Sequence, residues 1–274
     1  MGSPKSLILA VVAALALAAC GAGDRAASPP LTLGATTTLE DSGLLPALVA
    51  AFREAHPDIP VRTVTGGTGE VLALGRRGDV DVVLTHDPAA ESTFVAEGHG
   101  IDRHPVMWND FVIAGPASDP AGVRGMRDAA AALTAIARAR AGFVSRGDES
   151  GTHKKEQFLW REAGRVAPNS AAERWYIVAG VGMGDALRLA NARRVYILTD
   201  RATLRVLRPE LELEILVEGD PRLVNRYAVT RIRGAARAEA ANVFTDWITS
   251  PDGLRVVREF GRDRYGEPLY FVDE

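Results

Sequence analysis

The chain has 274 residues, of which 47% are apolar, 24% charged and 6% aromatic, a composition that excludes a disordered tail, a collagen-like fibre and a disulfide-stapled miniprotein. This length can bury a large core and predicts one large or two modest domains. The 35 acidic residues nearly balance the 32 Lys and Arg residues, with a net charge of −3, so we expect no nucleic-acid partner.

The N-terminal segment predicts export and attachment to a membrane. Lys5 precedes an uncharged run over residues 7–19, which suits the apolar region of a signal peptide but is too short to span a bilayer. The run ends at Cys20, the only cysteine, and this pattern resembles the signal box of bacterial lipoproteins; a plain secretory signal is the alternative. We expect residues 1–19 to be a lipoprotein signal peptide, Cys20 to carry the lipid, and residues 20–30 to tether an extracytoplasmic protein, periplasmic or on the cell surface.

The remaining chain alternates between strand and helix patterns. Strands are predicted at 31–33, 61–64, 80–84, 106–114, 143–144, 176–178, 195–198, 213–217 and 227–232. Helices are predicted around 44–52, with Asp41 or Ser42 as N-cap, around 71–74, 127–140 and 154–163, through Leu187 and Leu189, and around 236–248 and 254–260. The alternation favours a mostly parallel sheet, in which ligands bind where strands end and helices begin.

Loops rich in Gly, Ser and Thr open three of these helices, at 34–38, 66–69 and 145–153. The first backbone N–H groups of a helix lack intrahelical partners and carry partial positive charge, so such loops can bind an anion. Ordinary N-capping is the alternative for any one loop. Three dipoles alone bind weakly, and Arg146 is the strong donor expected to complete the site, unless it forms only a salt bridge with Asp148 or Glu149.

The loop Ser145-Arg146-Gly147-Asp148-Glu149-Ser150-Gly151-Thr152-His153-Lys154-Lys155-Glu156 closely resembles the signature of tungstate-binding proteins of bacterial ABC importers, the TupA-type family. Further stretches match the family in order along nearly all of the chain after the signal segment, at 41–45, 78–82, 109–116, 182–184, 198–201 and 217–220. The first loop departs from the family at Ala35, which lacks a hydroxyl group that the family carries there.

The resemblance implies an α/β fold of the periplasmic-binding-protein type II class, with two lobes and two crossover strands as hinge. Lobe I is expected at 31–110 plus 228–274 and lobe II at 111–227. A monomeric protein would hold a tungstate ion, or molybdate in its place, between the lobes for an ABC permease. It would have no enzymatic activity, cofactor or metal ion. The expected ligand contacts are Thr37, Thr38, Thr68, Gly69, Arg146, Ser150, Gly151, Thr152, Gly182 and Met183.

Three other functions are alternatives to tungstate binding. Phosphate capture would need a carboxylate to accept the proton of the anion, and Asp148 is the candidate. A secreted esterase or phosphatase would use Ser150 or His153, although neighbours in one loop rarely form a catalytic triad. The effector domain of a transcription regulator conflicts with the export signal. His86, His99 and His104 lack the spacing of a helical zinc site and are expected at the surface or in caps.

Overall fold

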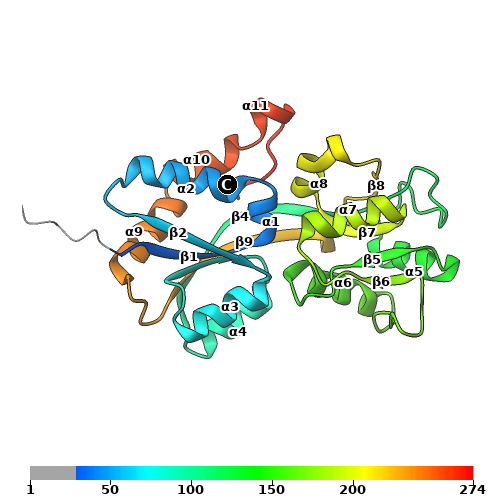
Figure 1. Ribbon diagram of the computed structural model, residues 1–274, viewed down its shortest axis with the longest axis horizontal. Coiled ribbons are helices and arrows are strands. Elements are labelled where there is room, and N and C mark those ends of the chain that lie inside the picture. Colours follow the sequence, from blue (N-terminus) through cyan, green and yellow to red (C-terminus); the bar gives the residue numbers. More distant parts are fainter. Residues whose placement is uncertain (1–28, 274) are drawn as a thin grey trace, which may run out of the picture.

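The computed structural model describes residues 29–273 and arranges them as two lobes side by side (Figure 1). The predicted signal peptide, Cys20 and all of the tether except Pro29 and Pro30 lie outside the described residues. Within residues 29–273, no helix is both long and apolar enough to cross a membrane.

Nine strands run through the described residues in the order β2-β1-β3-β9-β4-β7-β5-β6, with β8 paired to β4. Their bounds are β1 Leu31–Thr36, β2 Val61–Gly66, β3 Val82–Thr85, β4 Gly100–Gly115, β5 Phe143–Ser145, β6 Tyr176–Val178, β7 Tyr196–Asp200, β8 Glu214–Val217 and β9 Val224–Ile232. Pairs among β1, β2 and β3 and among β5, β6 and β7 are parallel, whereas β4 and β9 pair antiparallel with each other and with their neighbours. The predicted two-lobed α/β fold, with a mixed sheet flanked by helices, is confirmed, although the named strands of residues 29–273 form four parallel and four antiparallel pairs rather than mostly parallel ones.

Helices cover both faces of each half of the sheet (Figure 1). Their bounds are α1 Thr37–Asp41, α2 Leu44–Ala55, α3 Thr68–Arg77, α4 Pro88–Ala96, α5 Ala129–Ala139, α6 Gly151–Glu162, α7 Met183–Arg193, α8 Arg201–Leu207, α9 Ala238–Thr249, α10 Pro251–Glu259 and α11 Arg262–Tyr265, with short 3₁₀ turns at Arg208–Glu210 and Pro221–Leu223. In lobe I, α2, α9 and α10 enclose one apolar core and α3 and α4 a second. In lobe II, α5 and α6 cover one face of the sheet and α7 and α8 the other.

Four α-helices of the described residues were not predicted from the sequence: α1, α4, α8 and α11. The predicted N-cap of α2 was also wrong. Gly43, with a left-handed backbone (φ 82°), precedes α2, while Asp41 ends α1 and Ser42 follows it. The polar residues before α2 therefore belong to an additional helical turn, which frees Asp41 for a contact described below.

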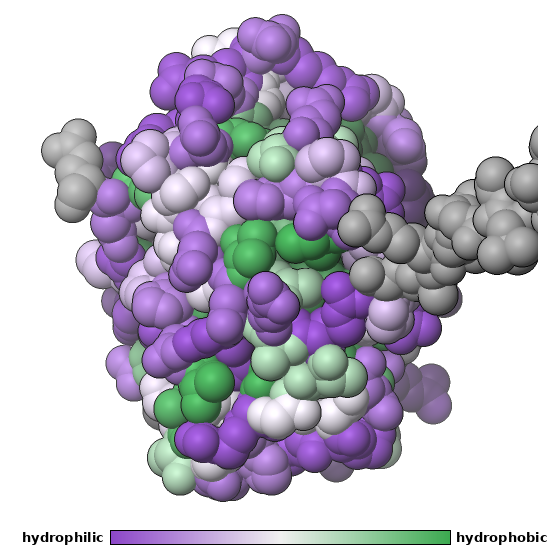
Figure 2. Space-filling view, turned by 90° about the vertical axis from the view of Figure 1, so that its left-hand side faces the viewer, coloured by the Kyte–Doolittle hydropathy of each residue, from purple (hydrophilic) through white to green (hydrophobic). Residues whose placement is uncertain are grey.

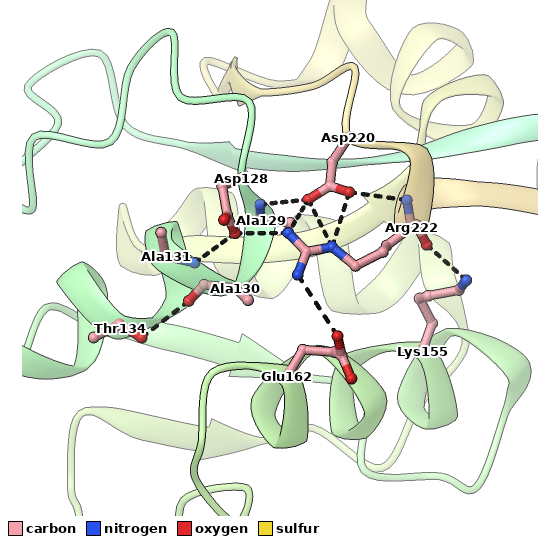
Figure 3. A network of polar contacts seen from close by, with 9 residues as sticks. All are labelled: Asp128, Ala129, Ala130, Ala131, Thr134, Lys155, Glu162, Asp220 and Arg222. Atoms are coloured by element: carbon pink, nitrogen blue, oxygen red, sulfur yellow. Dashed lines mark hydrogen bonds and ion pairs between the residues drawn. The ribbon is translucent and has the colours of Figure 1, made fainter.

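The hinge is built from β4 and β9, which pass between the lobes. Residues 100–110 of β4 pair with β9, and from Phe111 onward β4 pairs with β7 and β8. The polar cluster in Figure 3 fastens the start of β9 to lobe II: Arg222 binds Asp220 and Asp128, and Nζ of Lys155 donates to the carbonyl of Arg222 at 2.7 Å. The lobe limits inferred from the sequence stay a prediction.

Hydrophilic residues cover most of the face of lobe I that Figure 2 shows, with small hydrophobic patches between them. A protein surface carries such scattered apolar side chains routinely.

Candidate functional site

The N-termini of α3 and α6 meet across the boundary between the lobes. Gly67 precedes α3 and Ser150 precedes α6, both with extended backbone. The backbones are so close that a Cβ built on Gly67 would lie 3.2 Å from Cα of Ser150, and one built on Gly69 would lie 3.4 Å from the carbonyl oxygen of Glu149. Two helix ends with unpaired N–H groups and partial positive charge therefore converge, one from each lobe.

Arg146 lies at this junction and is only 2% exposed. Its Nε donates to Oδ2 of Asp148 at 3.1 Å and its Nη2 donates both to the same carboxylate and to Oγ1 of Thr37, the latter at 3.5 Å. Nη1 is buried and has no partner among the described residues. The salt bridge considered as an alternative role is thus present, and it leaves one charged donor free.

At the two helix starts, two hydroxyl groups are buried without a partner in the same way as Nη1. Oγ1 of Thr68, in the first turn of α3, and Oγ1 of Thr152, in the first turn of α6, are both buried without a hydrogen-bond partner in residues 29–273. A buried polar group left unpaired costs about 1–3 kcal/mol. Unpaired donors from both lobes at two meeting helix N-termini have the chemistry of an oxyanion site.

The first loop contributes less than its sequence suggested. Oγ1 of Thr38 contacts Oγ1 of Thr36 at 3.0 Å and the hydroxyl of Tyr227 at 3.3 Å, so it is already engaged inside lobe I. Ala35 is fully buried in β1, within the apolar core of that lobe. Thr37, which contacts Arg146, is the residue of this loop that faces lobe II.

The start of α7 has a partner within the protein. The N–H of Gly184 donates to Oδ2 of Asp41 in lobe I at 3.0 Å, and the side chain of Met183 lies in the apolar core of lobe II. Gly182 lies beside the same carboxylate. Burial raises the pKa of Asp41, which the bond from Gly184 and the charge of Arg146 oppose. The Asp41 carboxyl group thus lies at the start of α7, and the ligand contacts of Gly182 and Met183 stay predictions.

His86 was expected at the surface or in a cap, and that prediction was wrong. It follows β3 in lobe I, is 5% exposed, and its Nδ1 lies 2.8 Å from Oδ1 of Asn225. Asp87 caps α4 and Pro88 begins it, a helix-start signal that the sequence analysis missed. Burial lowers the pKa of His86 to about 4.

The arrangement of Ser150 does not suit a hydrolase. Its Oγ accepts a hydrogen bond from the N–H of His153 at 3.2 Å, as an N-cap. The imidazole of His153 instead lies beside the N–H of Glu149 and Nε2 of Gln157. In residues 29–273, no group of three or more His, Cys, Asp or Glu side chains could hold a metal ion.

Comparisons with known proteins identify the family of the chain. A family described as PBP superfamily domain matches residues 23–252. The tungstate-binding protein TupA of Peptoclostridium acidaminophilum is 39% identical over 97% of this chain and 96% of its own length. Among solved structures, the tungstate ABC transporter protein of Geobacter sulfurreducens is 40% identical (TM-score 0.76; 85% of this chain, 100% of that one), and TupA of Desulfovibrio alaskensis is 38% identical (TM-score 0.72; 90% and 99%). The chain therefore belongs to the TupA family of tungstate-binding proteins, within the periplasmic-binding-protein superfamily.

Proposed function

We propose that this protein binds tungstate, and molybdate as a close analogue, between its two lobes and delivers it to an ABC importer without chemical change. The supporting observation is a set of donors from both lobes that are buried and have no partner in the part of the chain that the structure describes: Oγ1 of Thr68, Oγ1 of Thr152 and Nη1 of Arg146. Backbone N–H groups of Gly69 and Gly151 at the same helix starts would complete the set, since the N–H of Ser150 already donates to Asp148. The relatives named above carry the same function in their names.

Phosphate is the competing ligand, and the contacts of Asp148 argue against it. At neutral pH phosphate keeps a proton and needs an acceptor. Oδ2 of Asp148 is bound by Arg146, and its Oδ1 accepts from the N–H of Ser150 at 3.2 Å. Both oxygens are engaged in positioning the loop, whereas a fully deprotonated dianion needs only donors.

Isothermal titration of the purified protein with tungstate, molybdate, sulfate and phosphate tests this proposal. We expect strong binding of the first two anions and weak binding of phosphate. Binding of phosphate alone would reject the tungstate assignment. Hydrolysis of a generic ester that disappears in Ser150→Ala would instead favour an enzyme.

The cellular arrangement follows from the proposed transport role. We propose a monomer held to a membrane through lipid on Cys20, on the extracytoplasmic side, where the permease receives the ligand. Membrane fractionation of cells that produce the wild-type protein and Cys20→Ala tests the anchor. Retention of Cys20→Ala in the membrane fraction at wild-type level would reject it.

A further inference from the structure

The imidazole of His86 in lobe I lies against the backbone at the start of α6 in lobe II. A Cβ built on Gly151 would fall 2.5 Å from Cε1 and 2.7 Å from Nδ1 of His86. Such separations do not occur between real side chains, so only glycine fits at position 151 while the ring stays in place. The ring therefore limits how closely the N-terminus of α6 approaches lobe I.

The ring cannot easily turn aside. Its Nδ1–H donates to Oδ1 of Asn225 at 2.8 Å, and Nδ2 of Asn225 donates to Oδ1 of Asn109 at 2.8 Å and to the hydroxyl of Tyr227 at 3.1 Å. The ring of Tyr227 packs on it with 4.9 Å between centroids. Asn109 and Asn225 belong to β4 and β9, so the hinge strands themselves hold His86 in position.

Burial, together with the surrounding charges, favours the neutral form of the His86 ring at this place. The N-terminus of α6 is the positive end of a helix dipole, which disfavours a cation. The charges of Arg146 and Lys155 act in the same direction, whereas Asp87 and the bond to Asn225 favour protonation. With Nδ1 donating to Asn225, the neutral ring keeps Nε2 unprotonated.

We propose that His86 is a positioning residue that sets the separation between the N-terminus of α6 and lobe I, and thereby the size of oxyanion that the closed site accepts. This inference rests on the proposed function of the site. Tungstate is larger than sulfate, although both are tetrahedral dianions. Removal of the imidazole would let α6 move closer to lobe I. The affinity for sulfate would then rise relative to the affinity for tungstate.

The first test measures affinity for tungstate and for sulfate in the wild-type protein, His86→Ala and His86→Gln. We expect the tungstate-over-sulfate affinity ratio to fall by about fivefold or more in His86→Ala, and less in His86→Gln because its longer side chain still fills part of the space. Equal losses for both anions would leave the ratio unchanged and would overturn the inference.

The second test exchanges volume across the contact. Gly151→Ala should weaken tungstate binding by about tenfold or more, and His86→Ala/Gly151→Ala should recover part of that loss because the new methyl group occupies the vacated space. Gly75→Ala is the matched control: its Cβ would lie 2.8 Å from Ile232 inside lobe I, and His86→Ala should not rescue it. Circular dichroism verifies that each variant folds.

The outcomes separate this inference from the function on which it rests. If the losses in the double variant are additive and the wild-type protein binds tungstate tightly, the positioning role of His86 is rejected and the proposed function is not. If the wild-type protein binds none of the oxyanions, both the proposed function and the positioning role of His86 are rejected.

Discussion

Asp41 in lobe I accepts a hydrogen bond from the backbone N–H of Gly184 in lobe II, with 3.0 Å between Oδ2 and N. Gly184 is in the first turn of α7, where N–H groups lack helical partners and the dipole favours a negative charge. The two residues are 143 positions apart in the chain, and their contact requires the lobes to be together. It therefore stabilises the closed arrangement from within the protein.

Asp41→Ala should accelerate release of tungstate and weaken its binding about tenfold, because a charge-assisted hydrogen bond of about 1.5 kcal/mol across the lobes is lost. Asp41→Asn keeps a hydrogen-bond acceptor but loses the charge, so its release rate and affinity for tungstate should lie between those of wild type and Asp41→Ala. Stopped-flow release and titration calorimetry measure both effects. Asp185→Asn, an exposed change on the same helix turn, is the control. Wild-type release from Asp41→Ala would contradict the role of this contact.

Arg146→Lys should weaken tungstate binding by about a hundredfold or more, equivalent to about 3 kcal/mol. Lysine keeps the charge, but its three N–H donors share one nitrogen, whereas the planar guanidinium binds Asp148 through Nε and Nη2 and keeps Nη1 as a donor on a separate nitrogen. Calorimetry on Arg146→Lys and on Arg138→Lys, an exposed position of α5, isolates the effect. Unchanged affinity would remove Arg146 from the site.

Thr68→Val and Thr152→Val should each weaken tungstate binding about tenfold while leaving the ligand-free protein as stable as wild type, or more so. Valine keeps the shape but removes a hydroxyl group that is buried without a partner, which costs about 1–3 kcal/mol in the ligand-free protein. Thr134→Val is the control, because its hydroxyl donates to the carbonyl of Ala130 at 3.0 Å (Figure 3). Thermal unfolding and calorimetry report the two effects; lower stability with wild-type affinity would refute this account.

Local patterns predicted much of the fold, because strands and longer helices repeat their apolar positions often enough to be recognised. The apolar run of β3 and the helical period over α2 are examples. The helices α1 and α8 have only 5 and 7 residues. Because an α-helical turn takes about 3.6 residues, these helices have too few positions to show a repeated apolar pattern. Tertiary contacts stabilise such short helices, which sequence spacing does not reveal.

The candidate site was predictable where the residues that form it lie in one loop. Residues 145–153 contain the donor, its carboxylate partner and a capped helix start within a single stretch. Asp41 and His86 were misread because their partners are distant in sequence: Gly184 for the first, Gly151 and Asn225 for the second. Burial created by the meeting of two lobes leaves no local pattern to find.

Lobe II also contains a buried carboxyl group whose ionisation should govern stability. Glu156 is 1% exposed and accepts hydrogen bonds from the hydroxyl of Tyr176 at 2.6 Å and from Nε1 of Trp160 at 3.0 Å. Burial raises the pKa of Glu156 to about 7, although both donors favour the ionised form. The folded protein therefore holds this proton at a pH where the unfolded chain has released it.

A carboxyl group with a raised pKa in the folded state stabilises the fold at low pH, and this contribution is lost as pH rises through about 7. Glu156→Gln keeps an acceptor for Tyr176 and removes the titration, so its free energy of unfolding should fall less than that of wild type between pH 5 and 8, by on the order of 3 kcal/mol. His86, with its lowered pKa, acts in the opposite direction in both proteins and cancels in the difference. Urea unfolding across this range measures it, with the exposed Glu259→Gln as control. Parallel pH profiles for wild type and Glu156→Gln would show that the folded protein does not retain the proton.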